Sequence, residues 1–229
     1  MRDRLAEVGF SGVVPVFPLP TTVFFPGVAL PLHVFEPRYR ALLKDAAAGE
    51  GLIAIATLLP GWEKDYEGAP PFHPLATIGR LGPIAQLPDG RSNILLHGLE
   101  RVRLEEEYAD RPYRLAQARV EPEAAVDESD PELADLKHRL LLAYAYYLQL
   151  VRRADAPITL MGDDVSFEAA VHTLCQSLDV PVLSKLRALE AAGPAQRAPM
   201  VRAWLAEKLD GVLRERGLPG LMGDGGEQN

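Results

Sequence analysis

A stretch dense in both proline and apolar residues, from position 13 to position 47, limits most strongly how this chain can fold. It holds six of the chain's 20 prolines. Proline has no N–H to donate to a sheet, so Pro15 and Pro18 predict that residues 13–19 form an edge or bulged strand rather than a central one. The apolar side chains between them still require a core, which the rest of the chain must supply.

The residues after this strand predict a turn, a second strand and a helix. Pro26 and Gly27 meet the requirements of a type II turn, in which glycine takes the position of positive φ. Residues 28–35 then read as a strand. Pro37 suits the first position of a helix, where its missing N–H costs nothing, and Glu36 beside it favours the positive helix end. We therefore expect a helix to begin at Pro37 and to pack on the strands.

Further strands follow in the first half of the chain. Residues 52–59 form a continuous apolar run of strand length, which predicts a buried central strand. Residues 76–87 and 92–104 are strand-like and are joined by Pro-Asp-Gly-Arg, a hairpin signal. Residues 113–120 alternate between apolar and polar side chains. The first half therefore predicts about six strands.

The second half has the pattern of a helical lobe. Residues 121–130 are acidic and have no apolar period, which marks a boundary. Asp130 and Pro131 can open a long helix, and Asp164 can cap another. A last helix is expected to end at Gly217 in a left-handed cap. Strands first and helices after is an α+β arrangement.

Two blocks of the sequence resemble one known family. FPLPTTVFFPGVALPLHVFEPRYRALL (17–43) resembles the opening of the Lon N-terminal domain, and IGRLG (78–82) together with HGLERVRL (97–104) resembles its later hairpin. Residues 186–217 match the helical part of that domain more loosely. This ATP-dependent protease La domain is the substrate-binding module that precedes the ATPase and protease domains of Lon proteases and also occurs alone in small bacterial proteins. The chain is identified as a member of the stand-alone form.

The resemblance implies a fold, and the residue patterns described above divide the chain into parts. The fold would be a twisted, partly closed β-barrel of the PUA-like type with one helix, followed by an α-helical bundle. The expected parts are a β-rich lobe at 1–121, an acidic linker at 122–130, a helical lobe at 131–217 and a disordered tail at 218–229.

Composition narrows the classes of partner. A net charge of −8 means that a nucleic-acid backbone is repelled on average. No window approaches the ~20 uncharged apolar residues that a membrane span requires. We therefore expect no nucleic acid, no membrane and a cytoplasmic location. The single cysteine excludes an internal disulfide.

Motifs for catalysis are missing from the sequence. A phosphate-binding loop of the G-x-x-x-x-G-K-[ST] type requires a Gly-Lys pair, and the sequence has none, so ATP hydrolysis is not expected. Nothing matches the serine and lysine of the Lon protease site, which lies in a separate C-terminal domain. G-x-S-x-G, H-E-x-x-H and G-x-G-x-x-G are absent as well. The prediction is a protein that is not an enzyme and needs no cofactor.

The histidines and the single cysteine are the candidate reactive or metal-binding groups of the sequence. His172 and Cys175 are neighbours on one helical face, and a histidine can lower the pKa of a thiol. Cys175 lies on the apolar stripe, so we expect a buried, inert thiol beside a histidine at the rim. The other histidines have no ligand spacing, which predicts no metal site: they are His33, His73, His97 and His138.

The motif residues of the two blocks have a structural and a functional interpretation. They are Pro26, Gly27, Glu36, Arg38, Tyr39, Gly98 and Arg101. The functional interpretation makes the charged ones contacts for a bound polypeptide. We favour the structural one, in which ion pairs hold the first block to the HGLERV hairpin.

Three aromatic residues in the loop 62–74 are candidate contacts for a polypeptide. Trp62, Tyr66 and Phe72 can either plug the end of the barrel or present an apolar surface to partners. Both interpretations stay open.

The resulting hypothesis is a non-catalytic substrate-recognition domain. It would bind unfolded or damaged polypeptides through apolar grooves and act as an adaptor or in quality control of protein turnover, with a protease as a second partner. The oligomeric state stays open. One alternative is a PUA-like protein that binds a small molecule or nucleotide, and another is an enzyme that uses Cys175 or a histidine.

Overall fold

The computed structural model describes residues 5–66, 68–108, 111–151 and 164–218, which fall into two compact units. The first unit comprises Met1–Glu123 and Pro181–Glu190, and the second comprises Ala124–Val180 and Ala191–Asn229. Residues 181–190, which the sequence placed in the helical lobe, thus group with the β-rich unit. The expected disordered tail lies outside the described residues, apart from residue 218.

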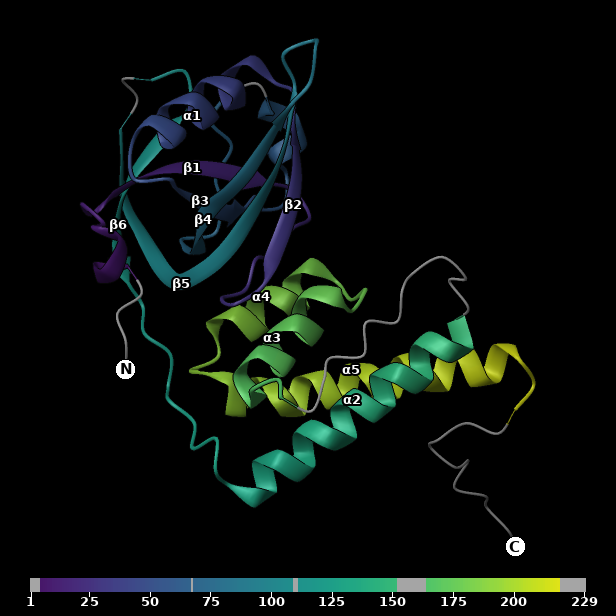
Figure 1. Cartoon of the computed structure of the whole chain (residues 1–229). Coiled ribbons are helices and arrows are strands. Elements are labelled where there is room, and N and C mark those ends of the chain that lie inside the picture. The colour runs from purple at the N-terminus through teal and green to yellow at the C-terminus, as the bar shows by residue number, and fades with distance from the viewer. Residues whose placement is uncertain (1–4, 67, 109–110, 152–163, 219–229) are drawn as a thin grey trace, which may run out of the picture. The chain divides into compact units, whose positions relative to one another are not determined.

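Six strands build the first unit, as the sequence predicted (Figure 1). They are β1 (Val13–Leu19), β2 (Ala29–Val34), β3 (Leu52–Thr57), β4 (Leu75–Gln86), β5 (Ser92–Tyr108) and β6 (Arg114–Val120). The order is β2-β5-β4-β3-β1-β6, and an additional pairing of β5 with β6 closes the sheet into a ring. The fold is therefore α+β with the barrel-like sheet that the resemblance implied.

Strand β5 closes the ring because it is long enough to pair with three other strands. It runs for 17 residues. Its first part pairs with β2 from Ser92 to His97, its later part pairs with β6 from Val102 onward, and β4 lies along the other edge. The register shifts at Ile78/Gly79 and Leu104/Glu107 mark bulges, which raise local twist and let the strands curve.

Strand β1 is central, so the expectation of an edge strand was wrong. It lies between β3 and β6. The two partners are staggered: β6 pairs with residues 13–16 and β3 pairs with residues 16–19. Pro15 is therefore registered only with β6 and Pro18 only with β3. A proline can occupy a central strand here because each one has a ladder partner on one side alone.

Strand β3 contributes to two cores, as expected for a buried central strand. All six of its residues are buried. Ile53 and Ile55 pack in a cluster with the helix α1 (Pro37–Ala48), whereas Ala54 and Ala56 pack in a second cluster with β4, β5 and β6. Alternate side chains leave opposite faces of a strand, which explains the division.

Three helices pack together in the second unit. They are α2 (Pro131–Val151), α3 (Phe167–Ser177) and α5 (Pro194–Glu215), while α4 (Val182–Glu190) belongs to the first unit. Asp130 accepts a hydrogen bond from the Glu132 N–H and caps α2 as predicted. Helix α3 is capped by Ser166, which accepts from Ala169, and not by Asp164 as the sequence suggested. Gly217, with φ of 69°, follows α5 in the left-handed conformation. Within the described ranges, no helix has the length and hydropathy that a membrane crossing requires.

Candidate functional site

An open pocket of about 440 Å³ lies where α1 begins. Phe35, Glu36, Pro37, Arg38 and Tyr66 line it. Four of these residues follow one another at the junction of β2 and α1, and Tyr66 comes from the loop after β3. Three of them, Glu36, Arg38 and Tyr66, were candidate residues from the sequence.

The polar groups of this pocket hold one another in place. Glu36 precedes the first helical residue, Pro37, but its side chain makes no cap hydrogen bond. Its carboxylate accepts instead from the Tyr66 hydroxyl at 2.7 Å and from Arg38 Nε at 3.0 Å. Both terminal nitrogens of Arg38 donate to the Tyr66 carbonyl oxygen at 3.2 Å. This network fixes the loop after β3 against the start of α1.

Burial and the nearby Glu36 carboxylate raise the pKa of two phenols, Tyr39 and Tyr66. Burial and the hydrogen bond to Glu36 raise the pKa of Tyr66 above its ordinary value. Burial, with the Glu36 charge adding to it, raises the pKa of Tyr39 to about 12. Tyr39 stacks on Phe17 with ring centroids 4.0 Å apart, so its ring is part of the core. Tyr66 is therefore a stable hydrogen-bond donor and Tyr39 a packing residue.

The three aromatic residues of the loop do not form one cluster. Trp62 meets Tyr66 edge to face at a centroid distance of 5.5 Å. Phe72 packs partly buried against the second barrel core, with the Arg114 guanidinium 4.0 Å from its ring centre. Phe35, by contrast, exposes 57% of its surface at the rim of the pocket. The aromatic lining of this pocket thus comes from Phe35 and Tyr66, and Trp62 lies beside Tyr66.

The glycine motif residues join the two sequence blocks. The Gly27 N–H donates to the Gly98 carbonyl at 2.9 Å, and the Gly98 N–H donates to the Val28 carbonyl at 2.8 Å. A Cβ on Gly98 would lie 2.4 Å from the Phe25 carbonyl oxygen, which real structures do not tolerate. Gly27 has the positive φ, 72°, that the predicted turn requires. Close approach of the two backbones explains why these positions are glycine.

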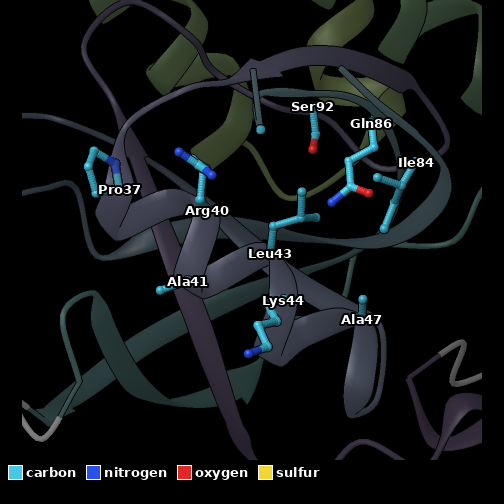
Figure 2. A pocket seen from close by; sticks show the side chains of 10 residues that line it. Pro37, Arg40, Ala41, Leu43, Lys44, Ala47, Ile84, Gln86 and Ser92 are labelled. Atoms are coloured by element: carbon cyan, nitrogen blue, oxygen red, sulfur yellow. The ribbon is translucent and has the colours of Figure 1, made fainter. Parts of the chain in front are cut away.

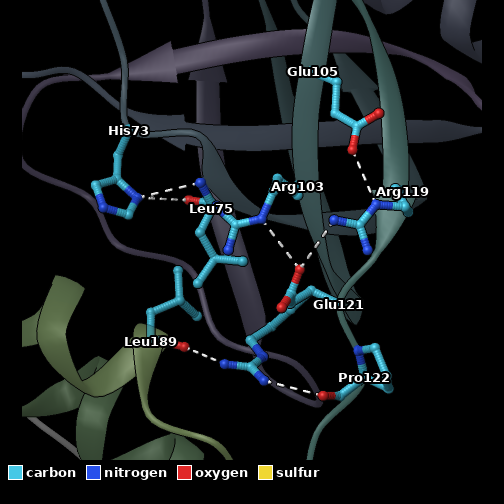
Figure 3. A network of polar contacts seen from close by, with 9 residues as sticks. His73, Leu75, Arg103, Glu105, Arg119, Glu121, Pro122 and Leu189 are labelled. Carbon is cyan, nitrogen blue, oxygen red and sulfur yellow. Dashed lines mark hydrogen bonds and ion pairs between the residues drawn. The ribbon is translucent and has the colours of Figure 1, made fainter.

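Arg101 anchors α4 rather than the first sequence block. Only 3% of its side chain is exposed. It donates to the carbonyls of Leu189 at 2.5 Å and Pro122 at 3.3 Å, which Figure 3 labels. It also forms an ion pair with Glu123 at 3.0 Å. The expected ion pairs between the first block and the HGLERV hairpin are therefore wrong, because Glu36 and Arg38 bind the Tyr66 loop.

A second, larger depression of about 680 Å³ adjoins the first at Pro37 (Figure 2). We call it the α1–hairpin groove. It runs between α1 and the hairpin of β4 and β5. Its lining consists of Pro37, Arg40, Ala41, Leu43, Lys44, Ala47, Ile84, Gln86, Gly90 and Ser92.

Three candidate reactive or polar side chains of the second unit, those of His172, Cys175 and Arg197, are buried. His172 and Cys175 are both fully buried, so the histidine does not lie at a rim as expected. Arg197, also fully buried, donates to His172 Nε2 at 2.5 Å and to the Ala191 carbonyl at 3.4 Å. Across the described ranges, no group of three or more His, Cys, Asp or Glu side chains could hold a metal ion.

Sequence reasoning missed Phe35 and the α1–hairpin groove. Phe35 is the last apolar residue before the helix that begins at Pro37. The strand pattern ends at this position, so alternation does not predict whether the Phe35 side chain is buried or exposed. Arg40 and Lys44 are spaced by four on the predicted helix, which places them on one face. That spacing was visible in the sequence, but the partner hairpin was not.

The closed sheet with one covering helix defines an α+β barrel domain. The chain belongs to the ATP-dependent protease La (LON) substrate-binding domain family, whose model matches residues 13–207. It is 27% identical over 198 residues to a Lon protease of Anaeromyxobacter dehalogenans and 27% identical over 198 residues to Lon protease 2 of Myxococcus xanthus. Each alignment covers 86% of this chain, but it spans only 23% and 24% of those relatives.

Solved structures share the fold. The N-terminal domain of a Mycobacterium avium complex Lon protease superposes with a TM-score of 0.64 at 17% identity, covering 85% of this chain and 98% of that one. A Lon N-terminal domain protein from Xanthomonas campestris superposes with a TM-score of 0.59 at 24% identity, covering 84% and 98%. At these identities the likeness concerns the fold.

Proposed function

We propose that this chain is a non-catalytic recognition domain that binds unfolded or damaged polypeptides in the cytoplasm. It would act as an adaptor or in quality control and would work with a protease. Membership of a substrate-binding domain family supports the class of ligand. One observation supports a particular binding surface: Phe35 is exposed beside the pocket that Tyr66 and Arg38 line.

The surface around Phe35 has the chemistry that such binding needs. Unfolded chains offer apolar side chains and unpaired backbone groups. Phe35, Trp62 and Tyr66 supply aromatic area, and aromatic residues dominate the energy of many protein interfaces. Glu36 and Arg38 lie in the same pocket and can form hydrogen bonds with backbone groups of a bound polypeptide at its edge. In this proposal Phe72 has no role in binding, because its ring packs on the core.

A binding measurement tests the proposal. Fluorescence anisotropy of labelled lactalbumin compares the reduced, alkylated form, which stays unfolded, with the native form. We expect saturable binding of the unfolded form and much weaker binding of the native one. Equal binding of both forms, or no binding at all, would contradict the proposal.

A second assay separates the small-molecule alternative. A nucleotide or small-ligand protein would be stabilised against heat by its ligand, because a ligand that binds only the folded state raises stability by mass action. A thermal-shift screen of nucleotides and common metabolites should leave the melting temperature unchanged. A clear rise with one ligand, together with failure to bind unfolded lactalbumin, would favour that alternative.

A further inference from the structure

The α1–hairpin groove carries positive charge on a negative protein. Arg40 and Lys44 line it from one face of α1, four residues apart, and both are exposed. Among the described residues, neither side chain has a hydrogen-bond or ion-pair partner. Like charges at this spacing destabilise a helix slightly, and the chain as a whole has a net charge of −8. The two cations are therefore unmatched where a partner of opposite charge would be favourable.

The acidic side chains near the groove are already occupied by other partners. Asp89, in the hairpin turn, pairs with Arg91 at 2.6 Å. Asp45, on α1, accepts from Tyr113 at 2.7 Å and pairs with Arg111 at 3.3 Å. Glu36 is held by Tyr66 and Arg38, as described above. These intramolecular partners leave the charge of Arg40 and Lys44 available to a ligand.

One wall of the groove includes Ile84 and Gln86, from a part of β4 that pairs with β5 along one side. The pairing of β3 with β4 ends at Leu52↔Arg80, but β4 continues to Gln86 and pairs there with β5. In the part of the chain that the structure describes, β4 has no strand partner on the β3 side between Ile84 and Gln86. An open edge of this kind accepts an extended segment through backbone hydrogen bonds.

The floor of the groove is apolar. The side chains of Leu43 and Ala47 come from α1, and Ile84, which exposes 41% of its surface, comes from β4. The sticks in Figure 2 show Arg40 and Lys44 along α1, with Ile84 and Gln86 on the hairpin. Apolar, cationic and strand-edge features thus lie within one depression.

We propose that the α1–hairpin groove selects acidic, extended segments of polypeptide, with Arg40 and Lys44 pairing the carboxylates. This inference rests on the proposed function and names the class of substrate that the domain prefers. A polypeptide fits better than a nucleic acid, because the floor is apolar and the net charge of the chain repels a phosphate backbone.

Three matched peptides test the inference. They share one apolar sequence and carry Glu, Gln or Lys at alternate positions, so only charge differs among them. Two exposed ion pairs should make the Glu peptide bind about three- to tenfold more tightly than the Gln peptide at low salt. The preference should shrink at high salt, because mobile ions screen exposed charges.

Variants locate the preference. The double variant R40Q/K44Q should abolish it without lowering the melting temperature, and R40E/K44E should favour the Lys peptide. The control R187Q/R202Q removes the same charge from two exposed arginines outside the groove and should keep the preference. Hydrogen exchange of residues 84–86 should slow when the Glu peptide binds.

Each outcome decides between the two proposals. Equal binding of the Glu and Gln peptides would overturn the groove inference and leave the proposed function standing. Equal loss in R187Q/R202Q would overturn it too, since only net charge would then matter. Stronger competition by a single-stranded oligonucleotide than by unlabelled Glu peptide would point to nucleic acid and overturn it. Failure of every peptide and of unfolded lactalbumin to bind would overturn both proposals.

Discussion

The backbone N–H of Gly27 donates to the backbone carbonyl of Gly98 at 2.9 Å, which joins two sequence blocks 71 positions apart. The contact holds the turn after the first strand directly against β5. No side chain intervenes, because a Cβ on Gly98 would lie 2.4 Å from the Phe25 carbonyl oxygen. Gly27 and Gly98 thus have a structural reason in this chain.

Gly98→Ala should lower the free energy of unfolding by about 1–3 kcal/mol or prevent folding, since the added methyl group forces the two backbones apart. Gly211→Ala is the matched control. Gly211 lies in α5 with open space around it, and alanine there should be neutral or stabilise by up to about 1 kcal/mol. Urea unfolding of both variants measures the difference. Similar stability of the two would show that the backbones at Gly98 can separate easily.

Arg101→Ala should destabilise the first unit by about 3–5 kcal/mol, because it leaves the nearly buried carboxylate of Glu123 and the Leu189 carbonyl without this partner. Arg103→Ala should cost less than about 1 kcal/mol, since the Arg103 side chain is 40% exposed in its ion pair with Glu121. Thermal melting followed by circular dichroism compares the two. Equal costs would contradict the anchoring role of Arg101.

The Glu36–Tyr66 hydrogen bond should contribute to stability, in line with a structural role for these motif residues. Glu36→Gln, Tyr66→Phe and the double variant form a cycle whose coupling energy we expect to be about 1 kcal/mol. The same proteins are then assayed for binding of unfolded lactalbumin. Unchanged melting with lost binding would assign Glu36 to ligand contact instead.

Alkaline pH should weaken the fold through Tyr39. Burial raises its pKa from 10.0 to about 12 in the folded state, so the folded protein holds the phenol proton more tightly than the unfolded chain does. The resulting stability is fully present below pH 10 and is lost as the pH rises through about 12. Tyr39→Phe keeps the stacking on Phe17 and should unfold at a higher alkaline pH. An identical alkaline midpoint for both proteins would rule out this contribution.

The thiol of Cys175 should be unreactive in the folded protein, because the side chain is fully buried on α3. A chromogenic thiol reagent should titrate one equivalent only after denaturant is added. Rapid reaction of the native protein would revive the alternative of an enzyme that uses this cysteine.

Local chemistry made much of the fold predictable. Gly27 required positive φ, Pro37 required a helix start, and the apolar run in β3 required burial on both faces. Each of these signals is carried by neighbouring residues. The expectation of an edge position for β1 failed because the staggered pairing of β3 and β6, which accommodates Pro15 and Pro18, depends on strands far along the chain.

The candidate site was predictable only in part, for the same reason. Glu36, Arg38 and Tyr66 were singled out from sequence, and the structure brings them into one pocket. Their pairing was not predictable, since it depends on where the loop after β3 folds back. Phe72 resembled Trp62 and Tyr66 in sequence, but its backbone forms a bridge with Leu58, and its side chain packs against the core. The α1–hairpin groove required knowing which hairpin faces α1.

The dissociation constant of Phe35→Ser for unfolded lactalbumin tests the central claim most directly. Leu183→Ser is its control, because Leu183 exposes the same 57% of its surface on α4, outside both depressions. Loss of the aromatic contact, worth about 1–2 kcal/mol, should weaken binding about five- to thirtyfold in Phe35→Ser and leave it unchanged in Leu183→Ser. Equal affinity of the two variants and the parent protein would show that unfolded chains do not bind at the Phe35 pocket.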